Sequence, residues 1–205
     1  MSKPHDPDPA PNPFSARHVR PGAIRFRFPA GKSAEGLLER LGQNNWQGQI
    51  VGPHGSGKSA LVAALIASIE RNGRRACLIE LHDGQRRLPV SRRRMSAFGP
   101  GTVLIVDGYE QLGPWGRFTL RRFRRRRGFG LVVTSHKSVG LPDLFRTTTS
   151  LGLAHEIVRD LLGSEPSPVA ADEVDQPFTS HEGNMREVLF DLYDLYEQRR
   201  VRRQR

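Results

Sequence analysis

The chain has 205 residues, enough for one domain with a buried core and a small appendage. A net charge of +11 favours a polyanionic partner, nucleic acid ahead of a ribosome or membrane surface. Its single cysteine excludes an internal disulfide framework, and the lack of 18 consecutive apolar residues or an apolar signal region predicts a cytoplasmic protein without a membrane span.

The N-terminal part divides into a leader, an arm and a short helix. Prolines at positions 4, 7, 9, 11 and 13 predict a disordered leader of polyproline character over residues 1–13. Residues 14–29 mix apolar side chains with arginine, and either dock on the core as an ordinary arm or cross the sheet edge near a nucleotide base. Ser33 is the expected cap of a short helix that extends to Leu41.

Residues 52–59, with the sequence GPHGSGKS, fit the phosphate-binding P-loop or Walker A pattern G-x-x-x-x-G-K-[ST]. The short run 49–51, which ends in two apolar residues, and helix-forming residues 59–69 after the loop supply the strand and helix that the motif requires. Glycines let backbone N–H groups face phosphate oxygens, Lys58 reaches the β- and γ-phosphates of ATP, and Ser59 ligates Mg²⁺. A glycine-rich turn without a ligand would leave the Lys-Ser pair unexplained. The predicted nucleotide-binding residues are Gly52, Pro53, His54, Gly55, Ser56, Gly57, Lys58, Ser59 and Ala60.

Two further strands follow the P-loop helix. Residues 76–81 form a compact apolar run, and residues 86–101 after it predict a short helix or an irregular basic connection. Residues 102–107, TVLIVD, have the Walker B form, a strand buried on both faces that ends in a carboxylate. Asp107 is therefore predicted to join Ser59 as a Mg²⁺ ligand beside the P-loop.

The stretch after Glu110 is rich in arginine. It is expected to be helical after Pro114, and seven arginines lie among the 11 residues from Arg117 to Arg127. No acidic residue occurs between Glu110 and Asp143, so a DNA or RNA phosphate contact is favoured over a solvated helix face.

The C-terminal third alternates ordered elements with one linker. The sequence predicts a strand ending in polar residues at 130–136, an edge strand at 145–149, a helix at 151–162 and an acidic linker at 164–178. A capping-box pattern at Thr179 predicts the start of the last helix, which has an apolar face and leads into a basic tail.

These motifs resemble the P-loop ATPases with an additional central strand, and the AAA+ type most of all. The resemblance rests on Walker A, Walker B and the intervening and polar-ended strands over roughly residues 46–163, and more weakly on Gly183-Asn184-Met185-Arg186, which is similar to the start of the sensor 2 helix. It implies that Ser135, at the strand end, acts as sensor 1 and that Arg186 contacts the γ-phosphate from the lid.

The predicted fold is an α/β class three-layer α/β/α sandwich with a mainly parallel five-stranded sheet, plus a C-terminal helix. Its predicted parts are a leader (1–13), a P-loop ATPase domain (14–163), an acidic linker (164–178), a C-terminal helix as a reduced lid (179–199) and a basic tail (200–205).

The chain departs from the family at the expected catalytic base. Gly108 follows Asp107 where the family usually has glutamate. The sequence leaves three alternatives open: Glu110, Glu80 or no efficient base. Arg186 is either a sensor or a structural residue at the helix start. The expected function is a slow ATPase coupled to a partner, either nucleic acid, protein or another copy of the chain. The alternatives are a non-hydrolysing switch or adaptor and, less favoured, a small-molecule kinase.

Overall fold

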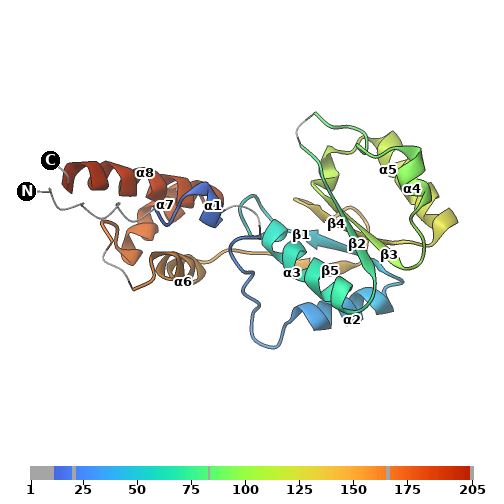
Figure 1. The fold of residues 1–205 in the computed structure, drawn as a ribbon, viewed down its shortest axis with the longest axis horizontal. Coiled ribbons are helices and arrows are strands. Elements are labelled where there is room, and N and C mark those ends of the chain that lie inside the picture. The colour runs from blue at the N-terminus through green and yellow to red at the C-terminus, as the bar shows by residue number, and fades with distance from the viewer. Residues whose placement is uncertain (1–11, 20–21, 83, 165–166, 204–205) are drawn as a thin grey trace, which may run out of the picture.

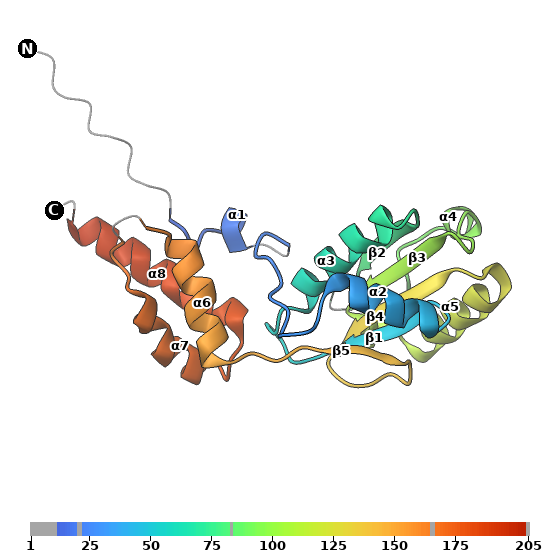
Figure 2. The ribbon, with the colours of Figure 1, turned by 90° about the horizontal axis from the view of Figure 1, so that it is seen from below.

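The computed structural model describes residues 12–19, 22–82, 84–164 and 167–203. Two parts lie next to each other in Figures 1 and 2, a sheet covered by helices and a smaller helical unit. All but the last two residues of the predicted leader lie outside the described residues. No helix in the described ranges is long and apolar enough to cross a membrane.

The sheet has five parallel strands in the order β2-β3-β4-β1-β5. This confirms the predicted α/β class with a parallel five-stranded sheet. Strand β4 lies between the strand that leads into the P-loop and the strand that carries Asp107, so it is the additional central strand. The strands are β1 (Gln47–Val51), β2 (Arg75–Glu80), β3 (Thr102–Asp107), β4 (Gly130–Ser135) and β5 (Asp143–Arg146).

Helices cover both faces of the sheet, as the continuous apolar character of β3 requires. Alternate side chains of β3 point to opposite faces, so Val103 and Ile105 pack in one core and Leu104 and Val106 in the other. The first face is covered by α2 (Ala34–Gln43), capped by Ser33 as predicted, and α3 (Lys58–Arg71); the second by α4 (Arg92–Ser96) and α5 (Pro114–Arg127).

The helical unit consists of α1 (Ala16–Val19), α6 (Leu151–Leu162), α7 (Asp175–Ser180) and α8 (Met185–Arg203), with the short 3₁₀ helix η2 (Ala171–Val174). It has an apolar core of its own, in which Val158 of α6 and Leu192 of α8 are fully buried. Arg27 links this unit to the sheet part through ion pairs with Glu156, at 3.1 Å, and Asp160 of α6.

The N-terminal segment is shared between the two parts. Phe14 is buried in the helical unit, with its ring centroid 6.3 Å from that of Tyr196, and Asn12 donates to Glu197 at 2.8 Å. Farther along, Phe26 and Phe28 pack on the sheet part. The arm therefore docks on both the helical unit and the sheet part, which agrees with the expectation of an ordinary docking arm.

The last helix begins at Met185 instead of Thr179. Thr179 lies in α7, and a turn with positive φ at Glu182 and Gly183 separates α7 from α8. The backbone N–H of Arg186 and the side chain of Asn184 supply the cap, at 3.2 Å, so the expected capping box does not form. Residues 171–174 of the expected acidic linker are helical, and α8 continues to Arg203 through most of the expected basic tail.

Candidate nucleotide-binding site

The P-loop connects β1 to α3 at the carboxyl edge of the sheet. Gly55 and Gly57 have φ values of +65° and +86°, which side chains rarely adopt. Gly57 is the N-cap of α3, so the first N–H groups of this helix open onto the loop. The P-loop motif needs a strand, then a glycine-containing loop, then the start of a helix, and the fold has them in this order.

Lys58 folds back over the loop that precedes it. Its Nζ donates to the carbonyl oxygens of Gly52, at 2.8 Å, and Pro53, at 2.6 Å. Burial lowers the pKa of Lys58, while the charges of Glu110 and Asp107 oppose that shift and the charge of Arg186 adds to it. Two carboxylates and a second cation therefore act on the P-loop lysine.

Ser59 and Asp107 lie together as the sequence predicts. The Ser59 hydroxyl donates to Asp107 Oδ2 at 2.8 Å, and the Thr134 hydroxyl donates to Asp107 Oδ1. Among the residues that the structure describes, no three His, Cys, Asp or Glu side chains gather into a metal cage. One hydroxyl and one carboxylate suit Mg²⁺, which keeps waters and takes substrate phosphate oxygens as its other ligands.

Glu110 is held by a histidine. It lies on the 3₁₀ helix η1 (Tyr109–Gln111), and its Oε1 is 2.9 Å from Nε2 of His136. The second carboxylate oxygen, Oε2, is buried and has no hydrogen-bond partner in the described part of the chain. An unpartnered buried carboxylate oxygen beside the P-loop can accept a hydrogen bond from a water or ligand.

His136 also contacts the P-loop. Its Nδ1 lies 3.3 Å from the Gly52 carbonyl oxygen, and its ring contacts that of His54 with centroids 3.7 Å apart and the planes tilted by 34°. Burial, and then the positive charge of Lys58, lowers the pKa of His136, against the opposing effect of Glu110. The histidine is therefore biased toward its neutral form.

At the polar end of β4, Ser135 is the residue predicted to act at the site, but its neighbours in the chain make the contacts there. Ser135 is buried and its hydroxyl donates to the Lys137 carbonyl oxygen at 2.6 Å, so the structure does not bring it to Glu110 or Asp107. Thr134 and His136, which flank it, make those contacts. The sequence does contain a signal for this arrangement. Side chains alternate between the two faces of a strand, so Thr134 and His136 are expected on the face opposite to Ser135.

The start of α8 meets the P-loop. A Cβ at Gly55 would lie 2.0 Å from Asn184 Oδ1 and 2.8 Å from the Met185 backbone nitrogen. Arg186, one residue farther along, is exposed and close enough for its charge to act on Lys58. The helical unit thus brings Arg186 near the loop.

Glu80 occupies a different position. It is the exposed last residue of edge strand β2, and its register partner in β3 is Asp107. The carboxylates that act on Lys58 are those of Glu110 and Asp107. Of the two candidate bases, Glu110 is the one that the fold brings into the Lys58 cluster.

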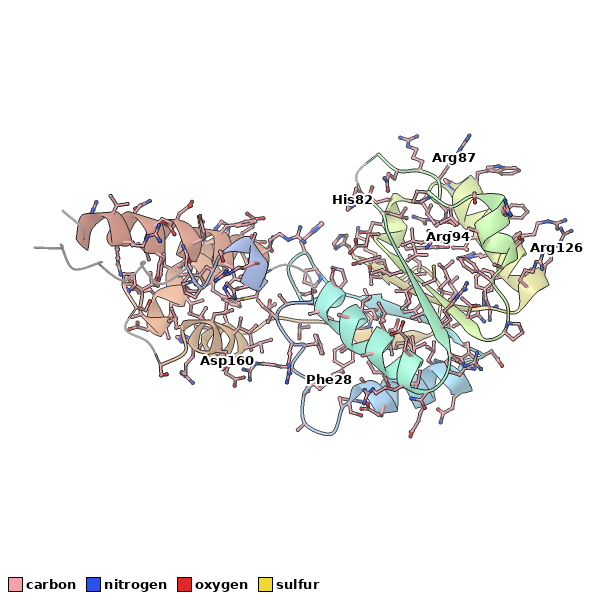
Figure 3. All side chains as sticks on the ribbon, viewed as in Figure 1. Phe28, His82, Arg87, Arg94, Arg126 and Asp160 are labelled. Carbon is pink, nitrogen blue, oxygen red and sulfur yellow. The ribbon has the colours of Figure 1, made fainter. Side chains whose placement is uncertain are left out.

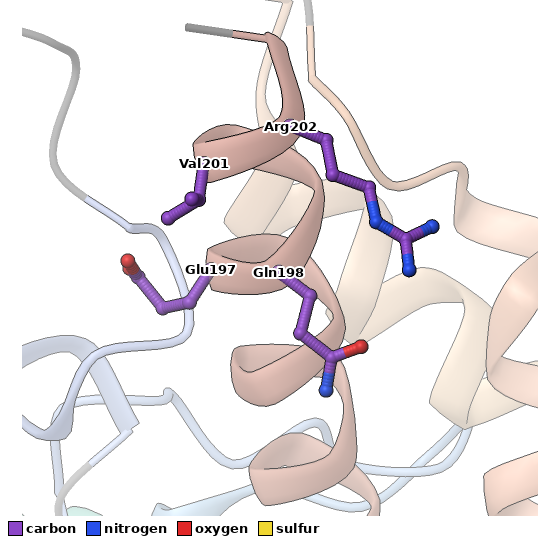
Figure 4. A pocket seen from close by; sticks show the side chains of 4 residues that line it. All are labelled: Glu197, Gln198, Val201 and Arg202. Carbon is purple, nitrogen blue, oxygen red and sulfur yellow. The ribbon is translucent and has the colours of Figure 1, made fainter. Parts of the chain in front are cut away.

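Two surface hollows differ in their chemistry. One lies near the C-terminal end of α8, away from the P-loop, and is lined by Glu197, Gln198, Val201 and Arg202 (Figure 4). The other adjoins the P-loop and includes two cationic side chains, which suits an anionic ligand. It is lined by Val51, Gly52, Pro53, His54, His136, Lys137, Arg146, Thr147 and Thr148.

No protein-family model and no curated protein matches this chain. Among solved structures, it is similar to two variants of RuvB from Thermotoga maritima. One has 15% identity, covers 78% of this chain and 68% of that chain and has a TM-score of 0.44; the other has 12% identity, 78% and 69% coverage and a TM-score of 0.43. It is also similar to PCH-2 of C. elegans, at 11% identity over 82% of this chain and 66% of that chain, with a TM-score of 0.39. Values this low do not carry a function from those proteins to this one.

Proposed function

We propose that this chain is an ATP-binding P-loop protein of AAA+-like architecture, which hydrolyses Mg-ATP slowly and couples its nucleotide state to a nucleic-acid partner. The observation that carries the proposal is the 2.8 Å hydrogen bond between Ser59 and Asp107, directly beside Lys58. Residues from two motifs 48 positions apart meet there at the carboxyl edge of a parallel sheet, where ligands of such sheets bind.

Different residues of the chain are proposed to contact the phosphates and the metal ion. The N–H groups of residues 54–60, which include the start of α3, face the phosphates. Lys58 moves from the Gly52 and Pro53 carbonyl oxygens to a phosphate oxygen. Ser59 and Asp107 hold Mg²⁺, which when bound neutralises charge on the β- and γ-phosphates.

Glu110 is the proposed base. Its Oε2 is buried without a partner among the described residues and is free to orient a water and take its proton, while Oε1 is fixed by His136. His136 is a positioning residue that replaces Ser135 in the sensor 1 role suggested by the resemblance. Arg186 approaches from α8 and supplies a second positive charge near Lys58, which suits stabilisation of the transferring phosphoryl group.

ATP hydrolysis is proposed to be slow because of the residues that follow Asp107. Gly108, with φ of +80°, takes the place where a glutamate would follow the Walker B aspartate, and a Cβ there would lie 2.8 Å from the Leu81 carbonyl oxygen. The acid is therefore moved to Glu110 on η1, where the contact with His136 Nε2 competes with a water for the carboxylate.

A non-hydrolysing nucleotide-dependent switch is the second candidate. The contact between Glu110 and His136 favours this candidate, because a carboxylate held by His136 is less available to a water. In that case bound ATP would stabilise the existing contact between α8 and the P-loop at Gly55 and Asn184, without turnover.

Calorimetric ATP titration and phosphate-release assays, with and without DNA or RNA, test the proposal. The wild type should bind Mg-ATP and release phosphate, and Lys58→Ala should lose both. Binding without phosphate release under every condition would favour the switch. A wild-type protein that does not bind ATP would overturn both candidates.

A further inference from the structure

Helix α5 carries two exposed aromatic side chains that the fold does not use. Trp115 is 75% exposed and Phe118 is 56% exposed. Their rings are stacked, with centroids 5.6 Å apart and an angle of 25° between the planes. The helix is anchored on its other side by Leu120, which is fully buried. The pair is therefore a flat aromatic surface facing solvent.

Arginines continue this surface along the helix. Arg122, Arg125 and Arg126 follow Phe118 by four, seven and eight residues, which places them on the same side of α5. All three are exposed. Within the described ranges, no arginine of α5 forms an ion pair with a carboxylate. We call the surface formed by these three arginines with Trp115 and Phe118 the α5 face.

The α5 face lies in a wider basic region. Arg87, in the loop after β2, and Arg94 of α4 are exposed, and Figure 3 places them with Arg126 at the end of the molecule opposite to Asp160 of the helical unit. That loop adjoins α5, since a Cβ at Gly116 would lie 3.0 Å from the Arg86 carbonyl oxygen. Cations on neighbouring elements therefore add to the charge of α5.

We propose that the α5 face binds single-stranded nucleic acid, with bases stacked on Trp115 and Phe118 and phosphates bound by the arginines. Exposed aromatic rings beside a cationic track are how proteins hold single strands, because every unpaired base offers a flat face. A duplex hides those faces and would leave the two rings in water. A membrane surface would need more apolar area than two rings among arginines provide.

The opposite side of α5 reaches the candidate base. Arg117 donates through Nη2 to the Glu110 carbonyl oxygen at 3.0 Å and through Nε to the Leu112 carbonyl oxygen at 2.8 Å, and it lies over the Tyr109 ring. A strand bound on the α5 face would thus contact the same helix that holds the Glu110 backbone through Arg117. Only this coupling rests on the proposed ATPase function, whereas strand binding does not.

Tryptophan fluorescence tests the proposal directly. The chain has two tryptophans, and Trp46→Phe leaves Trp115 as the only one. An oligothymidylate of about 12 nucleotides should quench it, since one binding site covers roughly 4–16 nucleotides. By fluorescence anisotropy of a labelled strand, Trp115→Ala and Phe118→Ala should each weaken binding about tenfold. Phe190→Ala, which removes an exposed aromatic ring of α8, is the matched control and should bind as the wild type does.

The salt dependence tests the arginines separately. The double variant Arg122→Gln/Arg126→Gln should lower the slope of log affinity against log salt by about 1.4, since each phosphate contact to a single strand contributes about 0.7. The control Arg159→Gln/Arg202→Gln removes two exposed arginines from the helical unit and should leave the slope unchanged.

Three results would overturn the proposal. They are an unquenched Trp115, equal or tighter binding of a duplex of the same length, and a blue shift of Trp115 with anionic phosphatidylserine vesicles but not with the strand. Lys58→Ala should bind the strand as the wild type does, so a protein that fails to hydrolyse ATP still tests this site. Loss of strand binding in Lys58→Ala without nucleotide would also count against the α5 face.

Discussion

Glu110 Oε1 lies 2.9 Å from Nε2 of His136, so the acid that follows the Asp107 strand is held by the residue that follows β4. Both belong to loops at the carboxyl edge of the sheet, and His136 also touches the P-loop through Gly52 and His54. One imidazole therefore links the candidate base to the candidate phosphate cradle.

The Ser59 hydroxyl should contribute to ATP affinity only when Mg²⁺ is present. Ser59→Ala removes a donor to Asp107 and a proposed metal ligand, and should weaken ATP binding at least tenfold in Mg²⁺ while changing it little in EDTA, as measured by calorimetry. Ser68→Ala, also on α3, removes a buried hydroxyl without a hydrogen-bond partner in the described residues and is the control. An equal loss of affinity in EDTA would remove Ser59 from the metal site.

Titration of His136 should make the fold less stable in mild acid. In the unfolded chain its pKa is about 6.5. Burial, with the charge of Lys58, lowers the pKa in the folded chain, so the unfolded state takes up more protons as the pH falls below about 6.5. The stabilisation that comes from neutral His136 in the folded chain is therefore fully present above about pH 6.5 and is lost as the pH falls below it.

His136→Asn keeps a hydrogen-bonding group but removes this titration. Between about pH 7.5 and about pH 5.5, the free energy of unfolding in urea should therefore fall more for the wild type than for this variant. Parallel pH profiles for the two proteins would contradict the lowered pKa of His136.

A side chain at Gly55 should separate α8 from the P-loop. Gly55→Ala places a Cβ 2.0 Å from Asn184 Oδ1 at a φ of +65°. Gly73→Ala has nearly the same backbone strain, with φ of +73°, but meets nothing within 4 Å. The difference in melting temperature between the two variants therefore reports the contact with Asn184, and Gly55→Ala should melt lower. Equal melting temperatures would mean that α8 does not press on the loop in solution.

Phe14 should be part of the helical core. Phe14→Ala removes a side chain that is 1% exposed and contacts Tyr196. It should lower the free energy of unfolding by about 3 kcal/mol, near the low end for a buried phenylalanine. Phe190→Ala, at 50% exposure, should cost less than about 0.5 kcal/mol. Urea unfolding measures both. Similar small losses would mean that the N-terminal segment does not dock on α8.

The sheet part was predictable because its signals are local. The Walker A residues, the apolar run of β3 and the Ser33 cap each depend on neighbours in the chain, and α6 begins and ends at the residues that periodicity indicates. Parallel strands also align their carboxyl ends, which is why the pairing of Ser59 with Asp107 followed from motif order alone.

The errors arose where a residue's role depends on tertiary contacts. The family resemblance places sensor 1 at Ser135, but the alternation of the strand turns this side chain away from Asp107. The capping-box pattern at Thr179 does not start the last helix, because a turn with positive φ at Glu182 and Gly183 follows it, and Gly183 packs closely against Thr149 and Phe178. The contact of Phe14 with Tyr196 spans nearly the whole chain, and no local pattern predicts it.

Turnover by Glu110→Gln, compared with Glu80→Gln, tests the central claim most directly. ATP affinity and phosphate release should be measured on the same samples in Mg²⁺. We predict that Glu110→Gln binds ATP as the wild type does but releases phosphate at least about 100-fold more slowly, while Glu80→Gln keeps the wild-type rate. Wild-type turnover in Glu110→Gln, or loss of turnover only in Glu80→Gln, would contradict the account.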